Sequence, residues 1–360
     1  MPSSLAVAAL TLLPMSIQSS DDWIINSSLY SLSYVENNSI YDFVKGKESD
    51  YKSGENAFTF NEFSLGAQYN NFSFSLFSRY EWFLDYSEDT MEFYGTTVNG
   101  TLIEADRKYN LDLDVQHINT EGFRLAYMHQ LNEINLYFAA SYLKARELLV
   151  GGANGQASLK ESCGDGFECY TGDLDLSYTY SEDIIFDRNV DAPKSLYGYS
   201  FDIGGDWIIN DSWFGSIYIQ DLFSEILWDK SPFTDASATT ATTTIDDGKY
   251  KIDPVITGYE GNENYKQTLP IKYNVLLSYQ FTPQHSTYIR GFHSYGATLF
   301  HLGYRFQHLG SLYGLKLYPL EGAVGVEFKN KYIDISIASE SFDYQDAELF
   351  EFKFAVTVPL

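Results

Sequence analysis

The chain has 360 residues, and its 49 Asp and Glu against 23 Lys and Arg give a formal charge of −26. This balance excludes a typical nucleic-acid-binding protein, because phosphate binding needs clustered Lys and Arg. It also disfavours a peripheral protein held by anionic lipid. Aromatic residues make up 17% of the chain, which suits β-strands, where such side chains pack well on a pleated surface.

The first 20 residues are expected to be a signal peptide. Residues 5–17 are mostly apolar and uncharged, but this stretch is too short to span a bilayer as a helix, which takes roughly 20 residues. Small and polar residues follow at 16–20, as they do before a cleavage site. No Lys or Arg precedes the apolar stretch, so we expect that the start of this leader is truncated. Residues 21–360 are then expected to form one domain.

From residue 21 onward the dominant pattern is an alternation of apolar and polar residues. In residues 109–116 four apolar side chains alternate with four polar ones, two of which are Asp112 and Asp114. A helix would mix these side chains, whereas a strand places them on opposite faces. The same alternation recurs in residues 72–82, 123–128, 134–142, 173–180, 197–204, 271–281, 300–307 and 332–337.

These rows have the length of strands that cross a bilayer. Many extend over about 8–12 residues, close to the 9–11 that a tilted strand needs to cross and longer than the usual strand of a soluble sandwich. Tyr or Trp often stands at their ends, as in the aromatic girdles of membrane barrels. After residue 20 no stretch is apolar enough for a membrane helix, and a membrane protein without such helices must be a closed barrel.

The connections between the rows alternate between short and long. Pairs such as Asn70-Asn71 and Asn210-Asp211 are of the types that tolerate tight hairpins. Other connections are long and polar, and we expect them outside the cell: residues 35–56, 83–104, 145–170, 182–195 and 229–266. We expect 229–266 to be a flexible extracellular loop, with a constriction inside the lumen as the alternative. The sequence therefore predicts an all-β, antiparallel, up-and-down transmembrane barrel of about 14 strands, within a range of 12 to 16.

The two cysteines, Cys163 and Cys169, lie in one short, turn-rich segment. In an exported protein they could form a disulfide, and two free thiols are the alternative. Two cysteines alone do not supply the ligands of a zinc site.

The last strand carries the most specific pattern. Six apolar residues occupy alternate positions from Phe350 to the final residue, ending in Phe354, Val356, Val358 and Leu360. In this the chain resembles the porin-like outer-membrane β-barrel proteins of Gram-negative bacteria, although their last residue is usually Phe. The resemblance implies a location in the cell outer membrane, in contact with outer-membrane lipid and lipopolysaccharide. It also implies that the barrel insertion machinery recognises this last strand.

No motif points to catalysis, and we expect neither an enzyme nor a cofactor or metal. The chain has no Gly-rich phosphate loop and no His-Glu-x-x-His. His293 and Ser294 are neighbours on one strand, so they point to opposite faces and cannot pair. The pairs Asp112/Asp114 and Asp173/Asp175 have a spacing that would suit paired carboxylates, but a polar lumen face produces the same spacing.

The alternation along the predicted strands instead places these Asp residues, together with several Arg, Lys and His residues, on the inside of the barrel. Charges of both signs facing a water-filled lumen would select solutes by charge. The candidate lumen-lining residues are Arg79, Asp112, Asp114, Arg124, Asp173, Asp175, Lys272, His301 and Arg305.

We therefore expect a pore for passive diffusion of small solutes that prefers cations. The alternatives are a transporter of hydrophobic compounds, a structural barrel of the envelope, and a secreted carbohydrate-binding β-sandwich. Whether the barrel is a monomer or a trimer is left open.

Overall fold

The computed structural model describes residues 22–360, apart from residues 102, 161–168, 241–242, 247–248, 253–254 and 344. The expected signal peptide and Cys163 lie outside the described residues, so the cleavage and the disulfide stay predictions. Among the described helices, none has the length and apolar character that crossing a bilayer requires.

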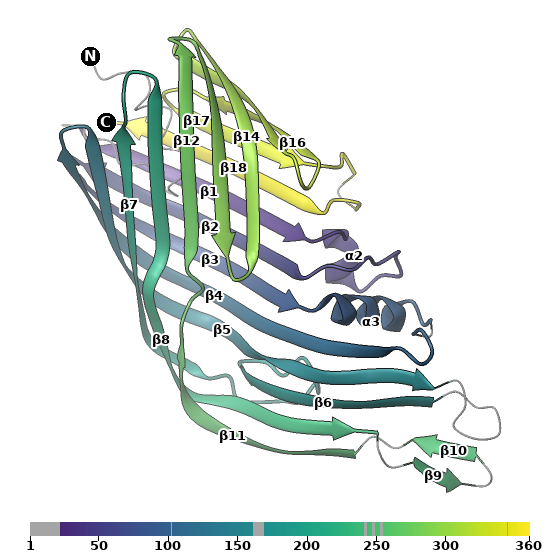
Figure 1. Ribbon diagram of the computed structural model, residues 1–360. Helices are drawn as coiled ribbons and strands as arrows, with labels where there is room; N and C mark the ends of the chain where they lie inside the picture. The colour runs from purple at the N-terminus through teal and green to yellow at the C-terminus, as the bar shows by residue number, and fades with distance from the viewer. Residues whose placement is uncertain are drawn as a thin grey trace.

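Fourteen antiparallel strands close into a barrel, and the last strand pairs with the first. The start of β1 and the end of β18 lie side by side at one end of this barrel (Figure 1). The strands of the ring are β1 (Ile24–Val35), β2 (Asn56–Tyr69), β3 (Phe72–Tyr86), β4 (Lys108–Leu131), β5 (Ile134–Lys160), β7 (Lys194–Ile208), β8 (Trp213–Thr239), β12 (Lys272–Thr282), β13 (His285–Ser294), β14 (Ala297–His308), β15 (Ser311–Tyr318), β16 (Ala323–Lys329), β17 (Ile333–Ser339) and β18 (Leu349–Pro359). The predicted fold and strand number are confirmed, and a ring that closes on itself excludes the β-sandwich.

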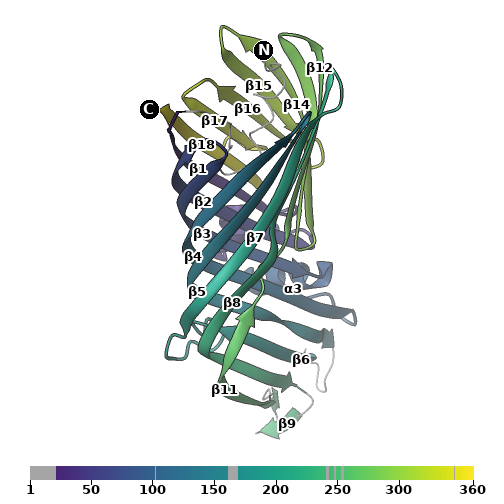
Figure 2. The same ribbon diagram turned by 90° about the vertical axis from the view of Figure 1, so that its left-hand side faces the viewer.

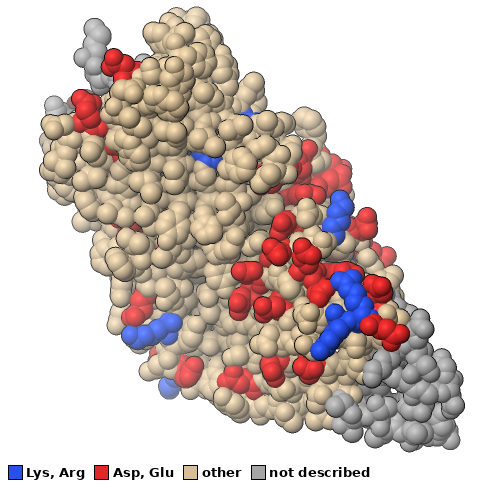
Figure 3. Space-filling model, viewed as in Figure 1, with Lys and Arg blue, Asp and Glu red and all other residues tan. Residues whose placement is uncertain are grey.

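The wall of the barrel has its apolar side chains on the outside. On β3, Phe74 is 48% exposed while its neighbour Ser75 is 1% exposed. The same alternation along the other strands leaves large apolar side chains on the outer face, and on the side seen in Figure 3 the barrel surface carries few charged side chains. A soluble protein buries such residues, so this face is built to contact hydrocarbon.

Beyond the ring, five strands form an open sheet, which we call the outer sheet. Strands β5 and β8 have 27 residues each and extend past the barrel together with the first half of β4. Two further strands, β6 (Cys169–Tyr180) and β11 (Val255–Gln267), pair with their outer halves. The sheet order is β4-β5-β6-β8-β11 (Figures 1 and 2). A small hairpin, β9 (Thr243–Asp246) with β10 (Lys249–Ile252), follows β8.

The outer sheet corrects two loop predictions. Much of residues 145–170 and 229–266, expected as loops, is strand. These segments alternate Gly, Ala, Ser and Thr rather than aromatic residues, because they meet water and packed loops instead of lipid. Their composition therefore resembled that of a loop.

One face of the outer sheet is apolar and covered by the chain itself. Helix α3 (Glu88–Val98) and the residues after it pack on Tyr109 and Leu159. Residues 181–193 pack on Leu149, Tyr178 and Tyr180. A short helix, α2 (Ile40–Lys45), lies beside the outer end of β1. The opposite face of the sheet is polar and open.

We predict that the protein extracted in detergent migrates faster on a gel before boiling than after it. A closed ring of hydrogen-bonded strands resists detergent at room temperature and stays compact until heat opens it. The measurement compares the two bands in a separated outer-membrane fraction. One band of unchanged mobility, found only in a soluble fraction, would contradict a membrane barrel.

Candidate functional site

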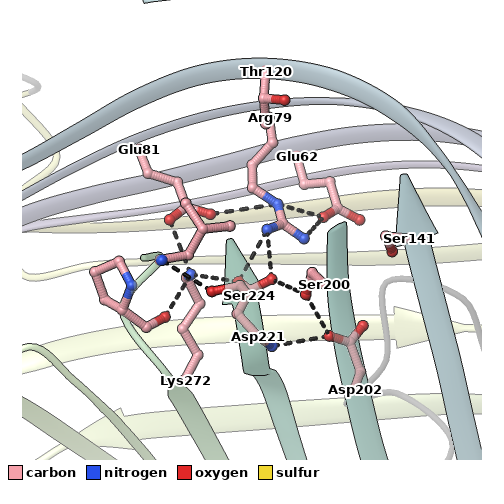
Figure 4. Close-up of polar contacts among 12 residues, drawn as sticks. Glu62, Arg79, Glu81, Thr120, Ser141, Ser200, Asp202, Asp221, Ser224 and Lys272 are labelled. Atoms are coloured by element: carbon pink, nitrogen blue, oxygen red, sulfur yellow. Dashed lines mark hydrogen bonds and ion pairs between the residues drawn. The ribbon is translucent and has the colours of Figure 1, made fainter. Parts of the chain in front are cut away.

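A network of buried ion pairs lies inside the barrel (Figure 4). Arg79 on β3 is its centre, with guanidinium nitrogens 3.1 Å from Glu62 Oε2, 3.3 Å from Glu81 Oε1 and 2.9 Å from Asp221 Oδ2. These acids come from β2, β3 and β8, so one side chain connects strands that are not neighbours in the ring.

Two more cations complete this central network. Lys272 Nζ lies 2.9 Å from both Glu81 Oε2 and Asp221 Oδ2. Arg124 lies 3.0 Å from Glu62 Oε1 and 3.6 Å from Asp202 Oδ2. The central network thus contains three cations and four carboxylates, and none of the seven side chains is more than 5% exposed.

Asp221 reaches the network because β8 is irregular at this point. Its φ of +58° is left-handed, a conformation that few residues other than Gly adopt and that Asn and Asp adopt more often than most. The pairing of β8 with β7 shifts register here, between Phe201 and Ile203. On its other side β8 pairs with β12 up to Gln220 and with β11 from Ile226 onward. Residues 221–225 therefore have no strand partner on that side.

The network keeps water out of this part of the barrel. Burying an ion is costly unless its partners replace the lost hydration. Here each cation faces two or more carboxylates, and Ser200 Oγ donates a further hydrogen bond of 2.6 Å to Asp221. Because these side chains are closed to solvent, no water-filled path passes between them.

A second buried ion-pair cluster joins β14 to β18. Arg305 Nε lies 2.9 Å from Glu327 Oε2, and Lys316 Nζ lies 2.6 Å from Glu351 Oε2. The cavity beside these groups has a volume of only about 20 Å³, roughly the space of one water molecule. His301 is buried nearby, with its ring 4.7 Å from that of Tyr318.

Toward the outer end, the inside of the barrel is apolar. Phe58, Phe83 and Phe292 belong to one buried cluster, and the rings of Phe58 and Phe83 stack at 5.7 Å. Trp228 and Leu269 belong to a second cluster beside the irregular part of β8. An aromatic and aliphatic layer therefore lies between the central network and the outer sheet.

The polar face of the outer sheet forms an acidic groove with a volume of about 630 Å³. Figure 3 shows acidic side chains gathered over this end of the molecule. Gly152 lies in the groove floor, where a Cβ atom would stand 2.2 Å from Leu113 O and 2.8 Å from Asp114 Oδ1. Small residues are thus required beneath the acids. The four acids that line the groove are Asp112, Asp114, Asp175 and Asp235.

The candidate lumen residues fall into two groups. Those with buried side chains inside the barrel are Arg79, Arg124, Lys272, His301 and Arg305. Those on the outer sheet are Asp112, Asp114, Asp173 and Asp175, and Asp173 pairs in register with Gln156. That any of them lines a conducting lumen stays a prediction.

The residues of the C-terminal pattern lie on β18 and at its end. Phe354 and Val358 are exposed on the outer face of the wall, and Leu360 donates its backbone N–H to Trp23 O at 2.8 Å. Recognition of this strand by insertion machinery stays a prediction.

Sequence reasoning missed Asp221 and could not have found it. Residues 213–229 give no sign of the irregularity that turns this side chain inward. Glu62 and Glu81 were open to detection, because they share strand parity with buried neighbours.

No family model and no curated protein matches the chain. Solved structures with a similar arrangement of strands include the CymD monoaromatic hydrocarbon channel, with 10% identity, 97% of this chain and 91% of that chain covered, and a TM-score of 0.40. The toluene transporter TodX of Pseudomonas putida has 11% identity, the same coverage and a TM-score of 0.40. The toluene transporter TbuX of Ralstonia pickettii has 9% identity, 98% and 92% coverage and a TM-score of 0.39.

The class of the protein is evident from its own closed ring and apolar outer face. The chain is a transmembrane β-barrel with the fold of bacterial outer-membrane proteins. That the short turns face the periplasm and the outer sheet lies outside the cell stays a prediction from the usual habit of such barrels.

We predict that Asp221→Ala lowers the free energy of unfolding by about 3–5 kcal/mol, because it leaves Arg79 and Lys272 buried with too few partners. The measurement is the urea concentration at which the fast-migrating band disappears. The matched control is Arg146→Ala, which breaks an exposed pair with Glu121 and should cost about 0–1 kcal/mol. Equal midpoints for the two variants would show that the network adds no stability.

Residues 181–193 should loosen in acid. Burial opposes ionisation of Asp183, but the hydrogen bonds from Arg188 and the Phe186 N–H outweigh it and hold the pKa of its carboxyl below the usual 3.8. A lowered pKa stabilises the segment above the ordinary value, and this contribution is lost as the pH falls through the lowered one. A spin label at residue 189 should gain mobility below about pH 4. In an Arg188→Ala variant the label should already be mobile at pH 7, and no change in either protein would refute the role of Asp183.

Proposed function

We propose that this barrel protein carries small hydrophobic molecules across the outer membrane. The observation that supports this is the order of the layers inside the barrel. An apolar, aromatic layer faces the exterior, and directly beneath it the central network excludes water. The interior therefore favours the hydrophobic transporter over the passive pore that we expected from the sequence.

Hydrated solutes do not fit this interior. A hydrated ion needs a continuous wet path or ligands that replace its water, and the carboxylates of the central network are already engaged by Arg79, Arg124 and Lys272. A small apolar molecule needs neither. It gains free energy by packing against rings such as Phe58, Phe83 and Trp228.

The irregular part of β8 supplies an exit for a small apolar molecule from the apolar layer to the bilayer. Residues 221–225 have no strand partner toward β12 and β11, and Leu269 of the second apolar cluster lies at that place, with its N–H on Ser224 Oγ at 2.9 Å. Outside the wall the side chain of Phe223 is exposed to the lipid belt. A molecule in the apolar layer is thus separated from the bilayer by side chains and not by a hydrogen-bonded ladder.

The solved barrels named above are described as a hydrocarbon channel and toluene transporters. The support for this proposal is the order of the layers inside this barrel and not that likeness.

The test places the purified barrel in planar bilayers and in vesicles that enclose a reporter of small aromatic compounds. We predict no steady ionic conductance and an uptake rate of toluene-sized molecules several times above that of empty vesicles. Leu269→Asp should reduce uptake by placing a charge in the apolar layer, whereas Leu320→Asp, on an exposed turn, should not. A stable cation-selective conductance would refute the proposal, and neither conductance nor uptake would favour the structural barrel.

A further inference from the structure

The two edges of the outer sheet differ in whether their outward-pointing backbone groups have hydrogen-bond partners. On the β4 edge, helix α3 occupies the backbone groups that point away from the sheet. Asn110 N donates to Asp89 Oδ2 and Asp112 N to Thr90 Oγ1, both at 2.8 Å, and Thr90 Oγ1 donates to Asp112 O at 2.9 Å. This edge is closed to any further strand.

The β11 edge is open. This strand of 13 residues pairs with β8 only, and no hydrogen bond between described residues uses the backbone of its outer edge. In an antiparallel pair every second residue turns its N–H and C=O away from the partner. Natural proteins usually blunt such an edge with Pro, inward-pointing charges or a covering segment. Here β11 has no Pro, and Ile256 and Tyr259 are 56% and 65% exposed.

The acidic groove adjoins this open edge. Its lining includes Thr257 and Tyr259 of β11, and it includes four Asp and no Lys or Arg. Across the sheet, Tyr259 lies opposite Asp235 and Thr257 opposite Ser237, which in turn lies opposite Asp175. A strand added to β11 would continue these rows, and every second side chain of that strand would lie at the rim of the groove.

We propose that the β11 edge binds an extended segment of another protein as an added strand, with Lys or Arg at alternate positions facing the acidic groove. The backbone of β11 supplies the hydrogen bonds of such a complex, as in other cases of strand addition. The Asp residues of the groove select for a basic segment.

A second copy of this chain fits the edge less well. It would bring Glu260 and Glu263 of its own β11 to the contact, together with a second acidic groove on a chain with a formal charge of −26. Like charges across a strand pair oppose pairing.

The test uses the intact barrel in detergent and a labelled ten-residue peptide of alternating Lys and Thr, with blocked ends, followed by fluorescence anisotropy. Two control peptides separate charge from strand addition. One has the same composition with its five Lys in one block, and the other is N-methylated at every amide. We expect both controls to bind at least tenfold more weakly than the alternating peptide. Equal binding of either control would overturn strand addition and leave an acidic surface that adsorbs cations.

Variants of the barrel test the site itself. Thr257→Lys puts a positive charge on the open edge, and Asp175→Asn with Asp235→Asn removes two groove acids. Each change should weaken binding of the alternating peptide by tenfold or more. The matched control is Glu133→Gln, which removes one acid at the short turn between β4 and β5, at the end of the barrel away from the outer sheet, and should leave binding unchanged. The boiled and unboiled gel bands verify that every variant forms a barrel.

Two further outcomes would overturn the proposal. One is binding of the alternating peptide that neither Thr257→Lys nor the double change of Asp175→Asn with Asp235→Asn weakens. The other is a dimer, seen by light scattering without peptide, that Thr257→Lys dissociates, because the occupant of the edge would then be a second copy.

Discussion

The whole structure depends on one constraint, that a backbone N–H or C=O in hydrocarbon must have a partner. The ring of strands satisfies it by pairing each strand on both sides and joining β18 to β1. Once the ring is closed, the pleat sends every second side chain outward to lipid and the others inward. Polar and charged residues have only the inside to occupy, so they must satisfy one another there. The central network and the cluster at Arg305 are the result.

The same constraint explains where the structure departs from regularity. Inside the belt an unpaired stretch of strand is tolerated only where other groups cover it, as Asp221 and the residues around Leu269 do at the break in β8. Outside the belt, water can satisfy the backbone. The outer sheet can therefore end in an open edge at β11, and its polar face can stay bare.

The features that could be predicted from the sequence are those that alternation alone dictates. The barrel class, its approximate strand number and the inward side of Arg124 and Lys272 are consequences of parity over a single strand. The outer sheet was missed because its strands have one face in water and the other under loops, so Gly, Ser and Thr replace the aromatic residues that mark a strand in lipid. Which acid pairs with which cation in the central network could not be predicted, because its members come from β2, β3, β4, β7, β8 and β12 and pairing between distant strands leaves no local signal. Asp221 adds a left-handed residue that no pattern indicates.

The pairing of β1 with β18 also sets the timing of assembly. Eleven residue pairs, from Ile24 with Pro359 to Tyr34 with Leu349, join the two ends of the chain. Contacts of such large sequence separation form late, since the loop that they close is almost the entire polypeptide. Until the last strand has been synthesised and delivered, the growing sheet has two unsatisfied edges and an apolar outer face. The whole chain must therefore stay unfolded and soluble until the last strand is present to close the ring in the membrane.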